Sequence, residues 1–350
     1  MKRTIVSGVF AALLGLGWIA STGIAQGPKV SGQGAMKFRV LYTASHLPPE
    51  AQASIKAAHG GFAVDTRPGK GETYFAIKGA GIIQISPDLK RTRMLKTPAA
   101  MKDTNMHNAT IWFGPNGTPY LTFPGNESRQ VFTTDLNGTL VHTLAPPPAG
   151  TDLGHPEPTN YFKSDGPFIP TDVEYLDGMF YIATGYSKLD YVLTARVQPK
   201  PFQAVWHDLS FGGKGTGVGQ FGTGHGITVP PGTRRIDVAD RPHSEIDRFT
   251  RYGQYISTLS LPQGSFPCDI DYLGNYATVG ALHGPDRTKG APIYILENDR
   301  LISTIMAKEE LGLETFQHIH NAVMRQVGGK YYLIVQAWNP GDFAILEQVI

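Results

Sequence analysis

The sequence predicts an all-β protein built as a six-bladed β-propeller, and three observations lead to this prediction. Glycine and proline, 41 and 26 residues of 350, make up about 19% of the chain, against a usual share of roughly 12%. A hydrophobic fraction of 41% with 17% charged residues indicates a globular chain that buries a large core. A short phrase, a turn that leads into an apolar strand, recurs five times, which is typical of propeller blades.

The first 25 residues predict a secretory signal peptide. Lys2 and Arg3 precede an apolar stretch over residues 5–20, and small residues follow up to a possible cleavage site after Ala25. A membrane anchor is the alternative, but the stretch is shorter than the roughly 20 residues that span a bilayer. We therefore expect an exported bacterial protein, located in the periplasm or outside the cell.

The rest of the chain predicts one domain. Residues 26–36, rich in glycine and serine, are expected to be a flexible linker, and residues 37–350 to be a single propeller. Cys268 is the one cysteine, so no internal disulfide can form, and no lipid-attachment cysteine follows the signal. We expect a monomer with no membrane span in the mature chain.

Charge is balanced along the sequence. The 31 basic and 29 acidic residues give a formal net charge of +2, and neither sign forms a long run. Proteins that bind nucleic acid usually carry a basic patch or stripe. We therefore expect no nucleic-acid partner.

The recurring phrase defines five blades, and a sixth precedes them. Each phrase leads through a glycine-containing turn into a second apolar strand, and the second residues of the phrases are 64, 54, 43 and 52 positions apart. The segment over residues 74–95 has the same strand, loop and strand, although its opening phrase is degenerate. Residues 37–43 alternate like a strand and could join the C-terminal blade, which would close the ring. A β-sandwich is the alternative, but it does not require a repeated phrase. The five phrases are MHNATI from Met106, PTDVEY from Pro170, GHGITV from Gly224, PCDIDY from Pro267 and IHNAVM from Ile319.

The second position of the phrase holds a histidine in every second blade. In order, this position holds His107, Thr171, His225, Cys268 and His320. Alternate blades of a six-bladed ring are about 120° apart, so three imidazoles would meet at the channel axis at one height. Three facial nitrogen ligands with open outer positions suit a metal, zinc before iron, copper or nickel.

Three further side chains occupy similar places where a second strand ends. Tyr186, Arg241 and His283 follow the second position of their phrases by 15 or 16 residues, so they should project from the same rim. A tyrosine beside a guanidinium and a metal can serve as a general base with a lowered pKa, and arginine can hold a carboxylate. The alternatives are a packed aromatic for Tyr186 and an ion pair with Asp240 for Arg241.

Two carboxylates follow the second position directly. Asp172 and Asp269 come after Thr171 and Cys268, and side chains alternate along a strand, so these carboxylates should point away from the aligned position. We expect them to accept hydrogen bonds from backbone amides of the opening turn. Metal binding by the two carboxylates is the alternative.

The stretch over residues 212–249, GGKGTGVGQFGTGHGITVPPGTRRIDVADRPHSEIDRF, resembles the NHL-type six-bladed propellers. Among these it is most similar to the peptidyl-α-hydroxyglycine α-amidating lyase family, and the resemblance extends over residues 70–350. It implies zinc held by three histidines from alternate blades and a structural calcium in the channel. It also implies cleavage of a carbinolamide into an amide and glyoxylate.

Carried over to this sequence, the resemblance gives the site residues. The zinc ligands fall on His107, His225 and His320, the catalytic tyrosine on Tyr186, and the arginine of the family's ADR phrase on Arg241. The sequence also departs from the family at three positions. The family's first-blade arginine is replaced by Lys78, its calcium-binding aspartate by Asn321, and a methionine by His318.

The function expected from the sequence is that of an exported, metal-dependent carbon–nitrogen lyase. Its substrate would be a small molecule or peptide whose anionic group contacts Lys78, Arg241 and His283. One alternative is a propeller hydrolase that acts on lactones or esters, although such enzymes usually place Asp, Glu and Asn around a calcium. The other is a binding propeller with a structural metal.

Overall fold

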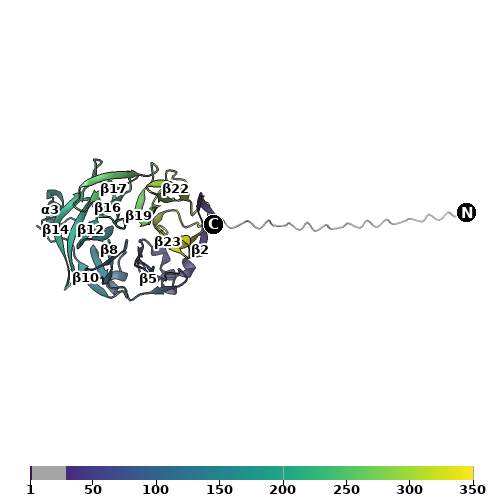
Figure 1. Cartoon of the computed structure of the whole chain (residues 1–350), viewed down its shortest axis with the longest axis horizontal. Coiled ribbons are helices and arrows are strands. Elements are labelled where there is room, and N and C mark those ends of the chain that lie inside the picture. The colour runs from purple at the N-terminus through teal and green to yellow at the C-terminus, as the bar shows by residue number, and fades with distance from the viewer. Residues whose placement is uncertain (2–28, 200, 350) are drawn as a thin grey trace.

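The computed structural model describes Met1, residues 29–199 and residues 201–349. The predicted signal peptide therefore lies, apart from Met1, outside the described residues. The described residues form six antiparallel sheets, arranged as blades around a central channel (Figure 1). The predicted six-bladed β-propeller is confirmed.

Blades 1 to 3 follow one another in chain order. Blade 1 consists of β3 (Ala63–Val64), β4 (Thr73–Ile77), β5 (Gly81–Ile85) and β6 (Thr92–Met94). Blade 2 consists of β7 (Thr110–Phe113), β8 (Pro119–Gly125), β9 (Gln130–Thr134) and β10 (Leu140–Leu144). Blade 3 consists of β11 (Asp172–Leu176), β12 (Met179–Ala183), β13 (Tyr191–Pro199) and β14 (Phe202–Gly212).

Blades 4 to 6 complete the ring. Blade 4 consists of β15 (Gly224–Thr228), β16 (Arg235–Asp240), β17 (Glu245–Thr250) and β18 (Tyr255–Ser260). Blade 5 consists of β19 (Pro267–Leu273), β20 (Tyr276–Ala281), β21 (Ile293–Glu297) and β22 (Arg300–Ile305). Blade 6 has five strands, β23 (Ile319–Val327), β24 (Lys330–Ala337), β25 (Asp342–Gln348), β2 (Met36–Thr43) and β1 (Ser31–Gln33).

Helical segments in the described residues are short and lie between strands. They are the α-helices α1 (Pro49–Ala53), α2 (Ala99–Lys102) and α3 (Pro156–Lys163), and the 3₁₀ helices η1 (Ala44–His46) and η2 (Ile55–Ala57). No helix within these residues has the length and hydrophobicity that crossing a bilayer needs. The high glycine content serves tight hairpins such as the turn between β11 and β12, where Asp177 and Gly178 both have positive φ.

The two ends of the chain close the ring in blade 6. Strand β2 pairs antiparallel with β25, from Phe38 opposite Gln348 to Thr43 opposite Ala344. This pairing confirms that residues 37–43 add to the C-terminal blade. It also corrects the predicted linker over residues 26–36, because β1 lies within that range and pairs with β2. The propeller therefore begins earlier in the chain than the glycine- and serine-rich composition of residues 26–36 indicated.

Apolar side chains fill the space between neighbouring blades. Phe75 of blade 1 stacks on Phe343 of blade 6 with ring centroids 5.4 Å apart, and Trp112 of blade 2 stacks on Tyr175 of blade 3 at 4.1 Å. Each fully buried aromatic of this kind stabilises the fold by about 1.5–3 kcal/mol. These contacts fix the inner strands around the channel, and with them the residues that face it.

Candidate metal centre

The structure brings the three histidines of the alternate blades together at the channel. His107, His225 and His320 are fully buried, and their ring centroids are 4.7 Å (His107 to His225), 4.5 Å (His107 to His320) and 5.1 Å (His225 to His320) apart. They come from segments more than 90 residues apart along the chain. The threefold spacing of the opening phrases therefore produces one compact cluster.

Each of these rings is oriented by a backbone carbonyl of the next blade. His107 Nδ1 lies 2.6 Å from the Thr171 carbonyl, and His225 Nδ1 lies 2.6 Å from that of Cys268. His320 Nδ1 lies 2.8 Å from the carbonyl of Gly60 in blade 1. A carbonyl only accepts hydrogen bonds, so Nδ1 carries the proton in all three rings. The lone pair is therefore on Nε2, as in metal-binding histidines.

The three rings carry too few protons for every contact of their Nε2 atoms to be a hydrogen bond. Burial lowers the pKa of all three imidazoles well below the usual value, so the rings are neutral at pH 7. Nε2 of His107 lies 3.1 Å from Nε2 of His320, which places two lone pairs opposite each other. Four ligands around zinc would be about 3.3 Å apart, given Zn–N bonds of about 2.05 Å. A shared cation therefore suits this contact.

Tyr186 lies against two of the three histidines. Its hydroxyl is 3.1 Å from His107 Nε2 and 2.9 Å from His225 Nε2, and it accepts a hydrogen bond from Arg241 Nη1 at 3.1 Å. One phenol proton can satisfy only one of these two nitrogens. Burial raises the pKa of Tyr186, and Arg241 only partly opposes this. The lowered pKa expected from Arg241 is therefore not produced by the protein groups themselves.

Arg241 is a buried cation that faces the cluster. Besides Tyr186 it contacts Cys268, with Nη2 3.1 Å from Sγ, and its Nε is buried without a hydrogen-bond partner. In the described part of the chain no carboxylate lies within ion-pair distance of it. The alternative ion pair with Asp240 is not formed. The Asp240 carboxylate accepts from the amides of Gly222 and Thr223 and lies 2.7 Å from Nδ1 of His243. Arg241 is thus available for an anionic ligand.

A fourth histidine, His59, lies against the cluster and was not predicted from the sequence. Its ring centroid is 4.5 Å from that of His107 and 4.5 Å from that of His320, and the ring stacks on Trp338 at 4.9 Å. One ring nitrogen from each of His59, His107 and His320 lies within 4.8 Å of the others. The feature that reveals His59 is the place of the next residue, Gly60. The Gly60 carbonyl orients His320 as the Thr171 and Cys268 carbonyls orient His107 and His225, so Gly60 stands at the second position of the degenerate opening phrase of blade 1.

The other predicted rim residues lie outside the histidine cluster. Lys78, at the end of β4, forms an exposed ion pair with Glu127 at 2.6 Å. His283 packs edge-on against His318, with ring centroids 4.9 Å apart, and burial lowers its pKa to about 4. His318 is connected to the cluster through Trp338, at 5.8 Å between centroids. These residues surround the site at a greater distance than Tyr186 and Arg241.

A second layer of polar side chains lies next to the histidines. Asn108 Nδ2 donates to Asp172 at 2.7 Å and to Asp269 at 3.3 Å, and Asn321 Nδ2 donates to Asp269 at 2.8 Å. The two carboxylates also accept from backbone amides, as expected, at Ile227 for Asp172 and Ile270 for Asp269. They nevertheless meet around the channel, contrary to the expected alternation.

β-bulges at the opening phrases explain why consecutive side chains reach the channel. The pairing of β19 with β20 shifts between Pro267 and Asp269, and that of β23 with β24 shifts between Ile319 and Asn321. A bulge re-aims the side chains on either side of it. His320 and Asn321 can therefore contribute to two successive layers.

The second layer concentrates buried carboxyl groups. Burial raises the pKa of Asp172 and Asp271 well above the usual value, that of Asp269 to about 7 and that of Glu174 to about 8. The side-chain oxygens of Asn108 and Asn321 are buried without hydrogen-bond partners. A cavity of about 630 Å³ is lined in part by Asp172, Glu174, Asp269 and Asp271. Carboxylate and amide oxygens are the donors that hard cations prefer.

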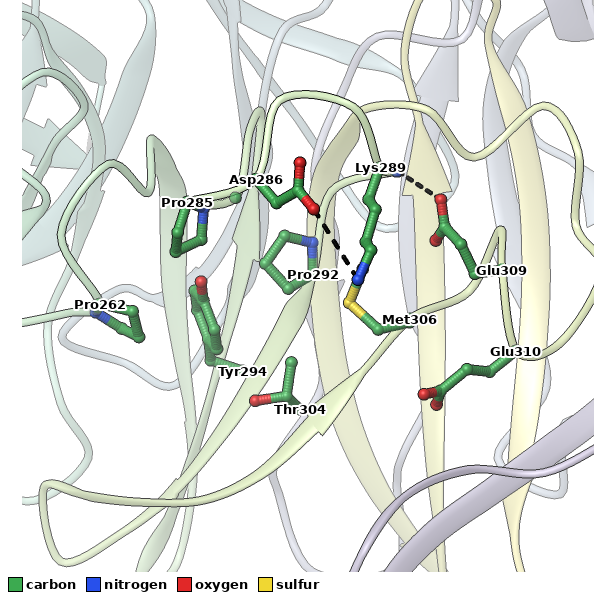
Figure 2. A pocket seen from close by; sticks show the side chains of 12 residues that line it. Pro262, Pro285, Asp286, Lys289, Pro292, Tyr294, Thr304, Met306, Glu309 and Glu310 are labelled. Carbon is green, nitrogen blue, oxygen red and sulfur yellow. Dashed lines mark hydrogen bonds and ion pairs between the residues drawn. The ribbon is translucent and has the colours of Figure 1, made fainter.

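Another cavity, of about 380 Å³, lies at blade 5, between the loop that joins β20 to β21 and the segment that follows β22 (Figure 2). Proline side chains, Tyr294 and Met306 make most of its wall apolar, and Lys289 pairs with Asp286 at its rim. None of the residues predicted for the site lines this cavity.

Comparisons with known proteins give similarity in fold. No protein-family model matches the chain, and no curated protein matches it. A streptogramin B lyase structure is 14% identical over 82% of this chain and 78% of its own, with a TM-score of 0.49. Hydrazine synthase from Kuenenia stuttgartiensis is 14% identical over 65% of this chain and 55% of its own, with a TM-score of 0.39. At these values neither structure carries an argument about function.

Proposed function

We propose that the protein is an exported, zinc-dependent carbon–nitrogen lyase that resembles the amidating lyases. The metal ligands would be His107, His225 and His320, with Tyr186 and Arg241 beside them. The observation that carries the proposal is the 3.1 Å contact between two unprotonated Nε2 atoms. Such a contact between acceptors is unfavourable unless a cation lies between them.

The donor set fits zinc. Three neutral imidazoles with bare Nε2 atoms, each oriented through Nδ1, match the ligand chemistry of a catalytic zinc. When bound, zinc supplies a Lewis acid that polarises the substrate oxygen and lowers the pKa of the adjacent phenol. The remaining chemistry belongs to side chains of this protein.

Tyr186 and Arg241 would act on different groups of the substrate. Arg241 binds the carboxylate of an N-acyl-α-hydroxyglycine, which supplies the anionic partner that this buried guanidinium lacks. Tyr186 accepts the hydroxyl proton as the carbon–nitrogen bond breaks and the carbon–oxygen double bond forms. The proton then passes to the amide nitrogen, so the products are an amide and glyoxylate, with no water and no oxidant consumed.

We propose a calcium ion in the second layer. Asp172 and Asp269 would hold it, with the unpartnered side-chain oxygens of Asn108 and Asn321 as further donors. This donor set fits calcium even though Asn321 replaces the aspartate of the resembling family. The pKa values of Asp172 and Asp271 are raised first by burial and then by repulsion from Asp269, and the ion would stabilise the ionised carboxylates against both effects.

The test of the lyase uses the full mature chain purified without chelator. Metal analysis should find one zinc per chain, and N-benzoyl-α-hydroxyglycine should release glyoxylate at a rate that a chelator abolishes and zinc restores. A chain that binds no transition metal would exclude the proposal. A chain that binds zinc but releases no glyoxylate would retain the metal centre and exclude this substrate.

One observation favours a second candidate, a calcium-dependent hydrolase of lactones or esters. Asp and Glu side chains of the second layer line one cavity, and Asn108 donates to one of them, Asp172; Asp, Glu and Asn are the donor set expected of such propeller hydrolases. Asp269→Asn and His225→Ala separate the two functions. A hydrolase should lose calcium-dependent ester hydrolysis on Asp269→Asn only, whereas the lyase should lose glyoxylate release on His225→Ala.

A further inference from the structure

His59 differs from the three neighbouring histidines in the partner of its Nδ1 atom. That atom lies 3.0 Å from Nδ2 of Asn105. An amide nitrogen only donates, so Nδ1 of His59 must accept, whereas Nδ1 of His107 and His320 must donate to carbonyls. In a neutral imidazole the single proton of His59 is therefore on Nε2. The cluster contains three rings with bare Nε2 atoms and one ring with an Nε2–H group.

The position of His59 is fixed from two sides. Its ring stacks on Trp338, with an interplanar angle of 28°, and lies edge-on to His107 and His320 at 76° and 80°. Asn105 is itself held, because its backbone amide donates to Glu127 at 3.1 Å. His59 is only partly buried, whereas the three other rings are fully buried. Of these four rings, His59 is therefore the one that solvent reaches.

We propose that His59 is a substrate-binding residue whose Nε2–H donates a hydrogen bond to an oxygen of the substrate, and that it is not a fourth metal ligand. The assignment rests on the proposed lyase function and adds a donor to it. Tyr186 contacts the cluster between His107 and His225, and His59 contacts it between His107 and His320. A substrate oxygen on the open side of the cluster would thus lie near Tyr186, which accepts a proton, and near the Nε2–H group of His59, which donates a hydrogen bond.

The first test reads the tautomers directly in the metal-free wild-type protein. Long-range ¹H–¹⁵N NMR spectra distinguish Nδ1–H from Nε2–H imidazoles, and His59→Gln assigns the His59 signals by their loss. We expect Nε2–H for His59 and Nδ1–H for His107, His225 and His320. An Nδ1–H tautomer at His59 would overturn the proposal, since its Nε2 would then be free to bind metal.

The second test separates a substrate donor from a metal ligand. In His59→Ala the affinity for zinc, measured by competition with a chromogenic chelator, should fall by less than about 10-fold. Loss of a residue that only supports a metal ligand already costs roughly 10–100-fold in affinity. The KM for N-benzoyl-α-hydroxyglycine should rise about 10-fold, as expected for one lost hydrogen bond. A loss of zinc affinity beyond 100-fold, with a changed Co²⁺ absorption spectrum, would make His59 a ligand instead.

Asn105→Asp is the matched variant, because it changes the tautomer and leaves His59 in place. A carboxylate at position 105 accepts from Nδ1–H, so Nε2 of His59 becomes a bare lone pair. Zinc binding should tighten about 10-fold while glyoxylate release falls. Unchanged zinc affinity together with an unchanged tautomer would contradict the role of Asn105. Absence of glyoxylate release in the wild type would overturn the lyase alone, because the tautomer and zinc titration decide the place of His59 without turnover.

Discussion

The histidine layer and the carboxylate layer of one channel differ in charge, although they are built from neighbouring residues of the same opening phrases. Burial makes the imidazoles of His107 and His320 neutral at pH 7. The next residues along the chain, Asn108 and Asn321, contact buried carboxyl groups whose pKa values are raised. In blades 4, 5 and 6 a β-bulge lies at this point of the phrase, between the layer proposed to bind a borderline-soft metal and the layer proposed to bind a hard cation.

The difference between the layers shows that the position of a residue within the opening phrase determines the layer to which its side chain contributes. The second position alternates between histidine and a residue whose carbonyl orients that histidine. The third position supplies Asn or Asp in four blades and glycine in blades 1 and 4. A Cβ at Gly61 would collide with Asn108, and one at Gly226 with the Cys268 carbonyl. Glycine is therefore required at the third position of these two blades.

The largest effect is expected from His107→Ala, which removes the ring shared by the contacts to His320 and Tyr186. Zinc affinity should fall by more than the roughly 100-fold limit for residues outside a ligand set, and glyoxylate release should reach background. Zinc titration and the glyoxylate assay measure both. His207→Ala, on the outer strand β14, is the control. Unaltered zinc content in the His107 variant would show that the metal lies elsewhere.

Tyr186→Phe should separate proton transfer from metal binding within the histidine layer. Loss of the hydroxyl removes the group that contacts His107 and His225, and kcat should fall by about 10²–10⁴-fold. Zinc affinity and calcium affinity should stay at the wild-type level. Tyr276→Phe, on β20 away from the channel, is the matched control. A wild-type kcat for Tyr186→Phe would exclude the tyrosine as the base.

The two layers should respond to pH with opposite signs. Below about pH 6.5 the unfolded chain protonates histidines that stay neutral in the fold, so the free energy of unfolding falls as pH falls. In the folded chain Asp269 keeps its proton up to about pH 7 and Glu174 up to about pH 8, whereas in the unfolded chain both lose it near pH 4. The free energy of unfolding therefore falls as the pH rises from about 4 to these folded-state pKa values.

Denaturation between pH 6.5 and 8 isolates the carboxylate layer. With a chelator present, the free energy of unfolding should decrease by at most about 1.4 kcal/mol per pH unit for each proton released. Glu174→Gln should reduce this slope, and calcium should oppose it by stabilising the ionised carboxylates. A chelated protein whose stability rises from pH 6.5 to 8 would contradict the raised pKa values.

Asn321→Asp should strengthen only the carboxylate layer. It adds a charged oxygen beside Asp269, so calcium affinity, measured by calorimetry, should rise about 10-fold. Zinc affinity should change little, because His320 retains its bond to the Gly60 carbonyl. Asn116→Asp, in the turn between β7 and β8, is the control. Equal calcium affinity in both variants would place the calcium away from Asn321.

The smallest effect is expected from Lys78→Met. Lys78 and Glu127 are both about half exposed and pair with each other, so their interaction contributes less than about 1 kcal/mol to stability. If the same limit applies to substrate binding, the KM rises at most about fivefold. Arg241→Met should raise it far more, since that guanidinium is buried. A larger effect at Lys78 than at Arg241 would reverse the assignment of the anion site.

The blades and the histidine triad could be predicted because both follow from repeated spacing. His107, His225 and His320 stand at one position of a phrase, and the sixfold ring converts that position into a shared point on the axis. Tyr186 and Arg241 were predicted from the resemblance to the amidating lyases, and the alignment of strand ends agrees with their place. Periodicity was enough to locate the three histidines without knowledge of any contact.

The remaining features depend on contacts that spacing does not encode. His59 was missed because its blade has a degenerate opening phrase, and only the bond from His320 to Gly60 reveals the alignment. The position of Asp269 beside Asp172 was missed because strand alternation ignores the β-bulge between Pro267 and Asp269. The raised pKa of Tyr186 reflects burial, which a linear distance to Arg241 cannot measure.

The pairing of β2 with β25 has a consequence for the order in which the molecule is made. A ribosome makes residues 36–43 well before residues 342–348, so β2 has no partner until β25 has been made. His320 lies on β23 of the same sheet. The three histidines therefore come together only when this sheet forms, and the proposed metal site is completed together with the ring.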